Sequence, residues 1–477
     1  MMKTLKHVWH WIDDRTGISE AIGPLAKHKV PPTGWAYVFG SATLFCFLLQ
    51  VVTGVGLALL YQPSSGAAYE SLQYITNEAP MGHFLRSLHY FGASGMVVMI
   101  GIHIIRVYLT AAYKFPREMN WVSGVVLFVL TVVMAYTGQL LRWDSNGLWS
   151  TLVGAEQLSR VPLIGPALAH FIFGGDVIGG DTLTRFFNYH VFIFPALIFG
   201  VVGFHLYLVI RNGISEPAQA SPPVDKKRYR QRYQAVLKER GVPFWPDAAW
   251  RDVVFSVLVI GALVTLALSV GAPELVGPPD PSNVLVKPHP DWYLLWPEAL
   301  YALMPYDIES YVMFLMPLVL FGLLFAVPFL SMGGARTPAR RPWAVVGVLL
   351  TLITIGSLTY LGAVAPWSPR FNTEPLATEE INATTPQQVH GYELFYEKGC
   401  QYCHRIEGQG GLRGPNLSEV GQRLTAREMT IRIVNGGYNM PAFGHSLTNE
   451  ELDDIVAFLQ SRTKAAEREE PPTAASD

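Results

Sequence analysis

The sequence is poor in charged residues and in cysteine. Asp, Glu, Lys and Arg make up only 15% of the 477 residues, against about 25% in typical soluble domains. The net charge of −2 offers no basic surface, so we expect no nucleic-acid partner. Three cysteines do not indicate a disulfide framework. Because 50% of the residues are apolar, the composition favours a membrane protein with a soluble appendage.

Long apolar runs mark seven expected membrane-spanning segments, each of about 20 residues. They lie near residues 34–60, 86–111, 121–141, 186–210, 251–271, 308–330 and 343–363. The first run is too long and begins too late for a cleavable signal peptide. We therefore expect an all-α protein, in which a seven-span helical bundle precedes a small soluble α-helical domain.

The basic residues between the spans predict the orientation in the membrane. Lys and Arg gather before the first span, between the second and third, after the fourth, and between the sixth and seventh. The loops 61–82, 143–184 and 272–307 hold few of them. Since basic loops stay in the cytoplasm, we expect a cytoplasmic N-terminus and an external location for everything after about residue 365.

Four histidines lie inside two of the spans, His89 and His103 on one and His190 and His205 on another. A helix turns by about 100° per residue, so separations of fourteen and fifteen return to nearly the same face, about 21 to 22 Å along the axis. Two such helices could hold two b haems, the outer between His89 and His190 and the inner between His103 and His205. One such histidine alone could be a packed core residue, but two matched pairs favour haem ligands.

Residues 400–404 read CQYCH and indicate a covalently attached c haem. In this pattern Cys400 and Cys403 form thioethers to the haem, and His404 reaches the iron. A zinc half-site or a redox dithiol is the alternative, but no second C-x-x-C completes a zinc site. A methionine is more often a packing residue, but Met440 is followed by Pro441 in a glycine-rich, non-helical stretch where a second axial ligand belongs, and is better explained as that ligand.

The C-terminal part resembles a class I cytochrome c over residues 386–462. A backbone carbonyl near Gly414, Pro415 and Asn416 is expected to bind the free ring nitrogen of His404. Residues 366–385 are expected to be a linker and 463–477 a disordered tail. Three helices are predicted by capping-box patterns at Thr385 with Gln388, Thr425 with Glu428, and Thr448 with Glu451.

The first 365 residues resemble cytochrome b of the quinol-oxidising, Rieske-partnered complexes. HIIRVYLT from His103 and TLTRFF before His190 match that family nearly residue by residue. The histidine spacing and the seven spans look like the chloroplast and cyanobacterial branch, which splits this length into two subunits. The resemblance implies a four-helix cytochrome b domain over 1–215 and a three-helix companion domain over 216–365.

The same resemblance implies further haem-binding residues. Glycines that repeat every fourteen residues would let the backbone approach a flat porphyrin, and arginines just before the outer histidines would hold haem propionates. Isolated glycines in membrane helices usually serve helix packing instead. The residues concerned are Gly40, Gly54, Gly124, Gly138, Arg86 and Arg185.

Residues 290–293 read PDWY and resemble the motif at the outward quinol-oxidation pocket of this family. A quinol loses two protons there, so the Asp291 carboxylate is the expected proton acceptor and Tyr293 its hydrogen-bonding neighbour. Outside the resemblance, a Pro-Asp pair is merely a turn. Within the family, the aspartate form is associated with lower-potential quinols, which favours menaquinol.

The chain departs from the family pattern at two places. Val38 stands where the chloroplast-type protein has a cysteine that tethers an extra haem on the cytoplasmic side, so nothing supports that haem here. Gln139 and Arg142 replace a tyrosine and a proline at the end of the third span, which puts the shape of the quinol pocket in doubt.

Together these features predict the core subunit of a quinol:cytochrome c oxidoreductase in a bacterial cytoplasmic membrane. Quinol oxidation at the outer face would send one electron through a separate Rieske protein to the c haem and the other through both b haems, contributing to proton translocation. A cytochrome c or an oxidase would accept the electrons, and the resemblance implies a homodimer. The alternatives are a non-bifurcating haem anchor that passes electrons linearly to a partner enzyme, and an ion transporter.

Overall fold

The computed structural model describes residues 2–175, 177–218, 223–280, 289–365, 370–381, 383–436 and 440–463. Two compact units are present. The first comprises Met1–Asp280 and Pro290–Thr359, and the second contains the chain from Tyr360 onward. We call them the membrane unit and the C-terminal unit.

Seven helices among the described residues are long and apolar enough to cross a membrane, which confirms the seven expected spans. Their ends differ from the expected ones by a few residues, because hydropathy marks the apolar core of a helix better than its caps. The spans are α3 (Phe39–Ala58), α5 (Gly82–Leu109), α6 (Glu118–Leu140), the continuous stretch Gly180–Asn212, α12 (Trp250–Ser269), α14 (Tyr306–Leu330) and α15 (Pro342–Val364).

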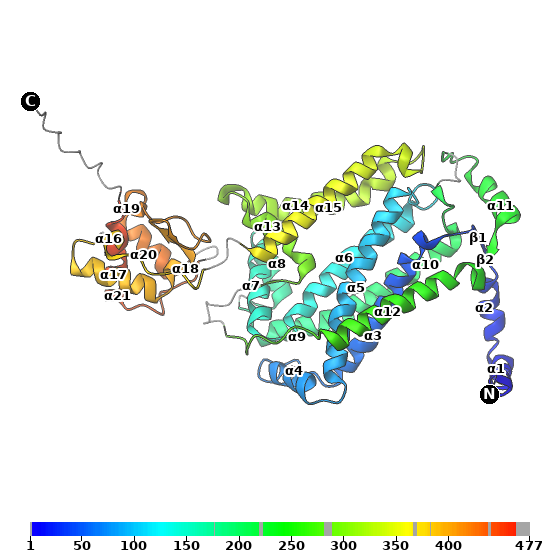
Figure 1. Ribbon diagram of the computed structural model, residues 1–477, viewed down its shortest axis with the longest axis horizontal. Coiled ribbons are helices and arrows are strands. Elements are labelled where there is room, and N and C mark those ends of the chain that lie inside the picture. Colours follow the sequence, from blue (N-terminus) through cyan, green and yellow to red (C-terminus); the bar gives the residue numbers. More distant parts are fainter. Residues whose placement is uncertain are drawn as a thin grey trace, which may run out of the picture. The chain divides into compact units, whose positions relative to one another are not determined.

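The spans pack by their apolar sides. Helix α3 lies along α5 and α6 along α10, while α12 contacts both α3 and α5, and α14 contacts α6 (Figure 1). Cys46 and Phe47 of α3 are buried in a core that Met96 of α5, Ile198 of α10 and Leu263 of α12 complete. Cys46 is therefore a buried apolar residue, as its place in a span predicts.

The fourth span is not a uniform α-helix. It consists of α9 (Gly180–Asn188), a π-helical turn η2 (Tyr189–Ile193) and α10 (Phe194–Asn212). Pro195, in the first turn of α10, has no backbone N–H to continue an α-helical hydrogen-bond ladder. The wide turn accommodates one extra residue in the helix.

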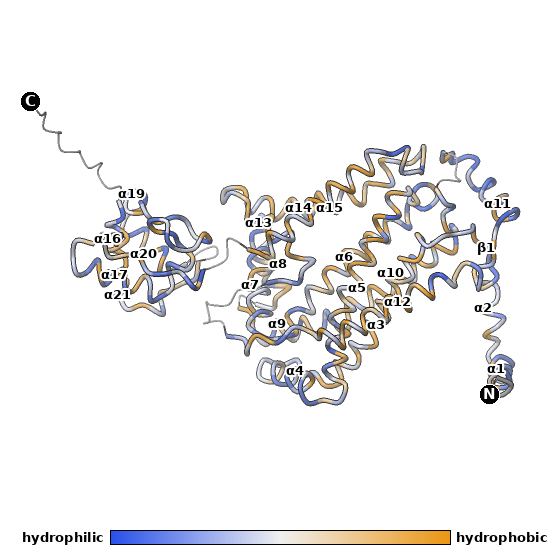
Figure 2. Tube along the Cα trace, in the orientation of Figure 1, coloured by the Kyte–Doolittle hydropathy of each residue, from blue (hydrophilic) through white to orange (hydrophobic). Residues whose placement is uncertain are grey.

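Shorter elements lie at the two ends of the spans, and Figure 2 shows polar residues gathered in them, above all in α11. One end, called the α7 end, carries α4 (Ala68–Asn77), α7 (Ser145–Ser159), α8 (Gly165–Phe173), η5 (Trp292–Leu294) and α13 (Leu295–Ala302). The other, called the α11 end, carries η1 (Trp35–Tyr37), α11 (Tyr229–Arg240), η4 (Phe244–Ala248), η6 (Pro338–Arg340), and strand β1 (Lys29–Val30) antiparallel to β2 (Val242–Pro243). Helices α1 (Met2–Thr16) and α2 (Ile18–Ala26) precede β1.

The C-terminal unit is built around three helices, α17 (Pro386–Glu397), α20 (Ala426–Asn435) and α21 (Asn449–Gln460), which confirms the expected three. Helix α17 crosses α21 so closely that a Cβ on Gly391 would stand 2.0 Å from the Asp454 carbonyl oxygen. The remaining elements are α16 (Thr378–Ile381), α18 (Cys400–Cys403), α19 (Val420–Arg423) and a hairpin of β3 (Arg405–Ile406) and β4 (Gln409–Gly410).

Local signals explain where the three main helices begin. Thr425 with Glu428, and Thr448 with Glu451, form complete capping boxes, as expected. The box expected at Thr385 is only half formed. Thr385 accepts a hydrogen bond from the Gln388 backbone, but the Gln388 side chain accepts from Thr384, one residue earlier.

The described part of the expected linker packs on the C-terminal unit. Residues 370–381 include α16, and Leu376 is only 5% exposed in the core of that unit. The Gln401 side chain donates to the Glu374 carbonyl at 3.0 Å. Because the Leu376 side chain is buried in this core, the stretch belongs to the C-terminal unit. The expected disordered tail lies outside the described residues from residue 464 onward.

Candidate functional site

The rings of His89, on α5, and His190, on η2, face each other near the α7 end. Their centres are 6.2 Å apart, with the ring planes at 75°. A metal–imidazole bond of about 2 Å on each side, plus about 1 Å from each nitrogen to its ring centre, would give about 6 Å for two histidines on one metal ion. The observed spacing therefore fits an iron held between the two rings.

Hydrogen bonds at the Nδ1 atoms orient both imidazoles. Thr53 Oγ1 lies 2.9 Å from His89 Nδ1. His190 Nδ1 lies 2.9 Å from the Met134 carbonyl oxygen, which can only accept, so this nitrogen carries the proton. The Nε2 atom of His190 then carries no proton. This is the form in which a histidine nitrogen binds a metal.

The second pair, His103 on α5 and His205 on α10, lies nearer the α11 end. Ser123 Oγ of α6 lies 2.8 Å from His205 Nδ1. Fifteen α-helical residues turn about 100° further than fourteen, so the two histidine spacings would not match on straight helices. The π-helical turn Tyr189–Ile193 contains His190, and its wider turn between this residue and His205 absorbs the extra residue.

Each of the four expected glycines faces one of the four imidazoles. A Cβ built on any of them would approach a histidine ring carbon, and at two positions more closely than 3.0 Å, which real Cβ atoms essentially never do. A side chain is thus excluded at Gly138 and Gly40, where the rings meet the neighbouring helix most closely. The distances to Cε1 are 2.6 Å from Gly138 to His190, 2.9 Å from Gly40 to His103, 3.2 Å from Gly54 to His89 and 3.6 Å from Gly124 to His205.

The two arginines expected at haem propionates bind backbone carbonyls in this structure. Arg86 donates to the Pro273 carbonyl at 2.6 Å, and Arg185 donates to the Phe171 carbonyl at 2.5 Å. A propionate role for either stays a prediction.

Sequence reasoning missed Arg106, which lies three residues after His103 on α5. Its guanidinium stacks 3.6 Å from the centre of the Tyr37 ring. Its Nε and Nη2 atoms are buried without a hydrogen-bond partner among the described residues. Buried cationic donors of this kind suit an anionic group, such as a propionate of a haem between His103 and His205. The motif HIIRVYLT contained the signal.

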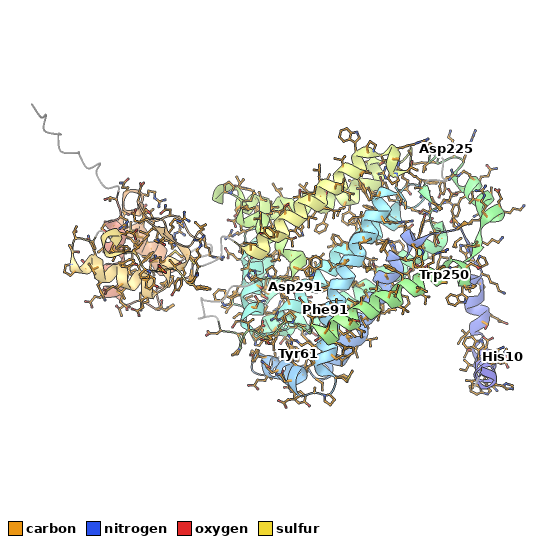
Figure 3. All side chains as sticks on the ribbon, viewed as in Figure 1. His10, Tyr61, Phe91, Asp225, Trp250 and Asp291 are labelled. Carbon is orange, nitrogen blue, oxygen red and sulfur yellow. The ribbon has the colours of Figure 1, made fainter. Side chains whose placement is uncertain are left out.

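The PDWY segment brings its two polar side chains together. Tyr293 donates its hydroxyl to Asp291 Oδ2 at 2.7 Å, and the neighbouring Trp292 donates to Ser94 of α5 at 3.2 Å. Asp291 and Tyr61 lie at the α7 end, opposite Asp225 and Trp250 (Figure 3).

Burial raises the pKa of Asp291 above the ordinary value of an aspartate. The hydrogen bond from Tyr293 and the positive charge of Arg142 act in the opposite direction. A desolvated carboxylate with a raised pKa is a suitable proton acceptor near neutral pH.

In the C-terminal unit, Cys400, His404 and Met440 line one apolar cavity. His404 Nδ1 lies 2.9 Å from the Pro415 carbonyl oxygen, as expected for an oriented axial histidine. A Cβ on Gly414 would stand 2.4 Å from this ring. The other lining residues are Phe395, Lys398, Leu417, Ile433, Phe443, Leu447, Ile455 and Leu459.

The two cysteines are unfavourable as metal or redox thiolates. Burial raises the pKa of Cys400 to about 12 and also raises that of Cys403. A zinc site or a redox dithiol needs the thiolate, and the described residues contain no cluster of three potential metal ligands. The apolar cavity lined by Cys400, His404 and Met440 fits a haem better than either alternative.

The chain matches two family models. Residues 27–213 match the family described as cytochrome b/b6/petB, and residues 387–459 match cytochrome c oxidase, cbb3-type, subunit III.

Curated relatives and a solved structure agree with the first match. The menaquinol:cytochrome c reductase cytochrome b subunit of Geobacillus thermodenitrificans is 38% identical over 222 residues, 45% of this chain and 99% of that protein. Cytochrome b6 of Heliobacterium modesticaldum is 39% identical over 211 residues, 44% of this chain and 99% of that protein.

A chain of a hyperthermophilic respiratory complex III superposes with a TM-score of 0.64 at 28% identity, covering 74% of this chain and 91% of that one. Together with the seven apolar spans, these similarities identify an integral membrane protein. The chain belongs to the cytochrome b/b6 family and carries a C-terminal cytochrome c domain.

Proposed function

We propose that this chain, the core subunit of a bc-type quinol oxidoreductase, oxidises quinol at the α7 end and passes the electrons both across the membrane and to its own c haem. The observation that carries the proposal is the pair of facing rings of His89 and His190, 6.2 Å apart, with a second pair fourteen and fifteen residues further on. Two such sites in one helical bundle form a path for electrons across a membrane.

The residues divide among three haems. His89 and His190 would hold the outer b haem, with Gly54 and Gly138 beside the rings, and His103 and His205 would hold the inner one, with Gly40 and Gly124. Cys400 and Cys403 would attach the c haem, and His404 and Met440 would bind its iron. When bound, these haems carry electrons one at a time.

Asp291 is the proton acceptor of the quinol pocket. In its carboxylate form it takes the proton from the quinol hydroxyl, while Tyr293 orients it through the 2.7 Å hydrogen bond. Releasing that proton to the external water contributes to proton translocation. Menaquinol is the favoured substrate, because the Geobacillus relative is a menaquinol:cytochrome c reductase subunit and the chain has the aspartate form of the motif.

The basic loops and the number of spans indicate the orientation of the chain in the membrane. The basic loops at the α11 end face the cytoplasm of a bacterial cell, and seven crossings put the α7 end and the C-terminal unit outside. The chain contains no Rieske signature, so a separate Rieske protein takes the first electron. A cytochrome c or an oxidase accepts electrons from the c haem, and the complex is a homodimer.

Depletion of the Rieske protein tests bifurcation. With the inner quinone site inhibited, added quinol should reduce the b and c haems together in the complete complex. After depletion both reductions should stop, because the second electron leaves the quinol only after the first. Reduction of both haem types at normal rates after depletion would instead establish a linear conduit between the quinone pool and a partner enzyme.

A further inference from the structure

A residue with a side-chain hydroxyl stands immediately before three of the four glycines that face the imidazoles. The three dipeptides are Thr53-Gly54, Ser123-Gly124 and Thr137-Gly138. At the fourth position Phe39 precedes Gly40. The glycine leaves room for the ring, and the residue before it determines which group lies beside the Nδ1 atom of that ring.

Thr53 is an acceptor for the Nδ1–H group of His89. A hydroxyl has one proton to donate and two lone pairs that accept. Thr53 Oγ1 lies 2.7 Å from the Leu49 carbonyl oxygen and 3.3 Å from that of Gln50, which can only accept, so its proton is directed to its own helix α3. Its lone pairs therefore face His89 Nδ1, 2.9 Å away. With the proton on Nδ1, the Nε2 atom of His89 is free to bind iron.

Ser123 repeats this arrangement at the second histidine pair. Its Oγ donates to the Met119 carbonyl at 2.9 Å, within α6, and lies 2.8 Å from His205 Nδ1. Thr53 and Ser123 are only 1% and 4% exposed. Because both hydroxyls are buried, bulk water does not compete for either bond.

The two histidine pairs differ at their remaining rings. His190 Nδ1 lies 2.9 Å from the Met134 carbonyl oxygen and 3.2 Å from Thr137 Oγ1. The residue that corresponds to these hydroxyls beside His103 is Phe39, whose ring has no hydrogen-bonding group and packs edge-on against Phe255. The dipeptides therefore offer a hydroxyl to both rings of the outer pair and to one ring of the inner pair.

A hydrogen bond at Nδ1 changes the strength of the ligand at Nε2. An imidazole that donates from Nδ1 gains partial negative charge and becomes a more basic metal ligand. Extra electron density favours the ferric over the ferrous state, and hydrogen bonding around the ligands is one of the means by which a protein adjusts a haem. Each such bond should therefore lower the reduction potential of the haem whose ligand donates it.

We propose that Thr53 and Ser123 are positioning residues that lower the reduction potentials of the outer and the inner b haem, respectively, by accepting a hydrogen bond from an axial histidine. The proposal rests on the proposed function, in which both histidine pairs bind haem. The outer pair has acceptors on both rings, so its oxidised state is stabilised more. An electron is then transferred from the outer to the inner site with a favourable change in free energy.

A redox titration of the purified complex, followed by the absorbance of the b haems, tests this role. The c haem serves as the internal reference. Thr53→Val keeps the branched shape but removes the acceptor, so the one-electron equilibrium constant of the outer haem should change by about tenfold, a rise in potential of about 59 mV. The inner haem should be unaffected. Thr53→Ser keeps the hydroxyl and should retain the wild-type potential.

Thr43→Val is the matched control. It is the same substitution on the same helix, and the Thr43 hydroxyl donates to the Phe39 carbonyl of that helix at 2.8 Å. Both b-haem potentials should stay at their wild-type values. Ser123→Ala should raise the potential of the inner haem alone. Thr137→Val should have a smaller effect than Thr53→Val, because the Met134 carbonyl still accepts from His190.

The titrations separate an electronic role from a merely structural one. Outer-haem potentials that are equal in Thr53→Val and Thr43→Val would overturn the proposal. A rise in Thr53→Val that also appears in Thr53→Ser would overturn it too, because the hydroxyl would then not be the cause. If Thr53→Val assembles without the outer haem, an unchanged inner potential in Ser123→Ala would overturn the proposal by itself. A wild-type complex without b haems would instead contradict the proposed function.

Discussion

Gly138→Ala should selectively weaken binding of the outer b haem. The new Cβ would stand 2.6 Å from His190 Cε1, whereas ordinary contact begins at 3.4 Å, so the ring or the helix must give way by about 0.8 Å. The ring cannot easily retreat, because the Met134 carbonyl oxygen and Thr137 Oγ1 lie 2.9 and 3.2 Å from its Nδ1. Both groups belong to the same helix as Gly138.

The expected cost is that of overpacking a tight interior, about 1–3 kcal/mol. Since about 1.4 kcal/mol is a factor of ten in affinity, haem affinity at this site should fall by about tenfold to a hundredfold. Redox difference spectra of the purified variant, with the ratio of b to c haem from the pyridine haemochrome, measure the loss. The c haem reports that the chain has assembled.

Gly124→Ala provides the matched control. It is the same substitution on the same helix, but its Cβ would meet His205 at 3.6 Å, an ordinary contact. The inner b haem should therefore be retained. Full retention of the outer haem in Gly138→Ala, or a greater loss in Gly124→Ala, would refute the reasoning that the glycines make room for the imidazoles.

Three further predictions concern other parts of the site. Replacing His103 by Ala should remove only the inner b haem, because each site takes one ligand from each helix; spectra that lose the outer haem instead would mean that the pairing is wrong. Asp291→Asn should slow quinol oxidation strongly with normal haem spectra, and should abolish the rise of wild-type turnover as the pH increases through the raised pKa of Asp291; unchanged turnover would move the role to another group. Gly414→Ala should disrupt the axial site of the c haem, since its Cβ would stand 2.4 Å from the His404 ring, and an unaltered c-haem spectrum would contradict this.

Local patterns in the sequence were enough to predict the seven spans, the two histidine pairs, the CQYCH motif and two of the three capping boxes. Apolar length, helical periodicity and cap chemistry act within one segment, so one segment suffices to recognise them. The hydrogen bond from Tyr293 to Asp291 joins residues two apart and follows from the same local logic.

The tertiary structure decided what depends on distant partners. The π-helical turn compensates for the spacing of fifteen residues on one helix against fourteen on the other. A prediction that assumes 3.6 residues per turn throughout cannot find such a turn. Arg142 donates a hydrogen bond to the Glu274 carbonyl, 132 residues away, and Arg106 stacks on Tyr37. Neither contact could be predicted from neighbouring residues in the sequence. Residues 370–381 likewise pack on the C-terminal unit through a core that exists only in the folded chain. A single apolar residue, Leu376, among prolines and threonines gives no periodic pattern from which this packing could be predicted.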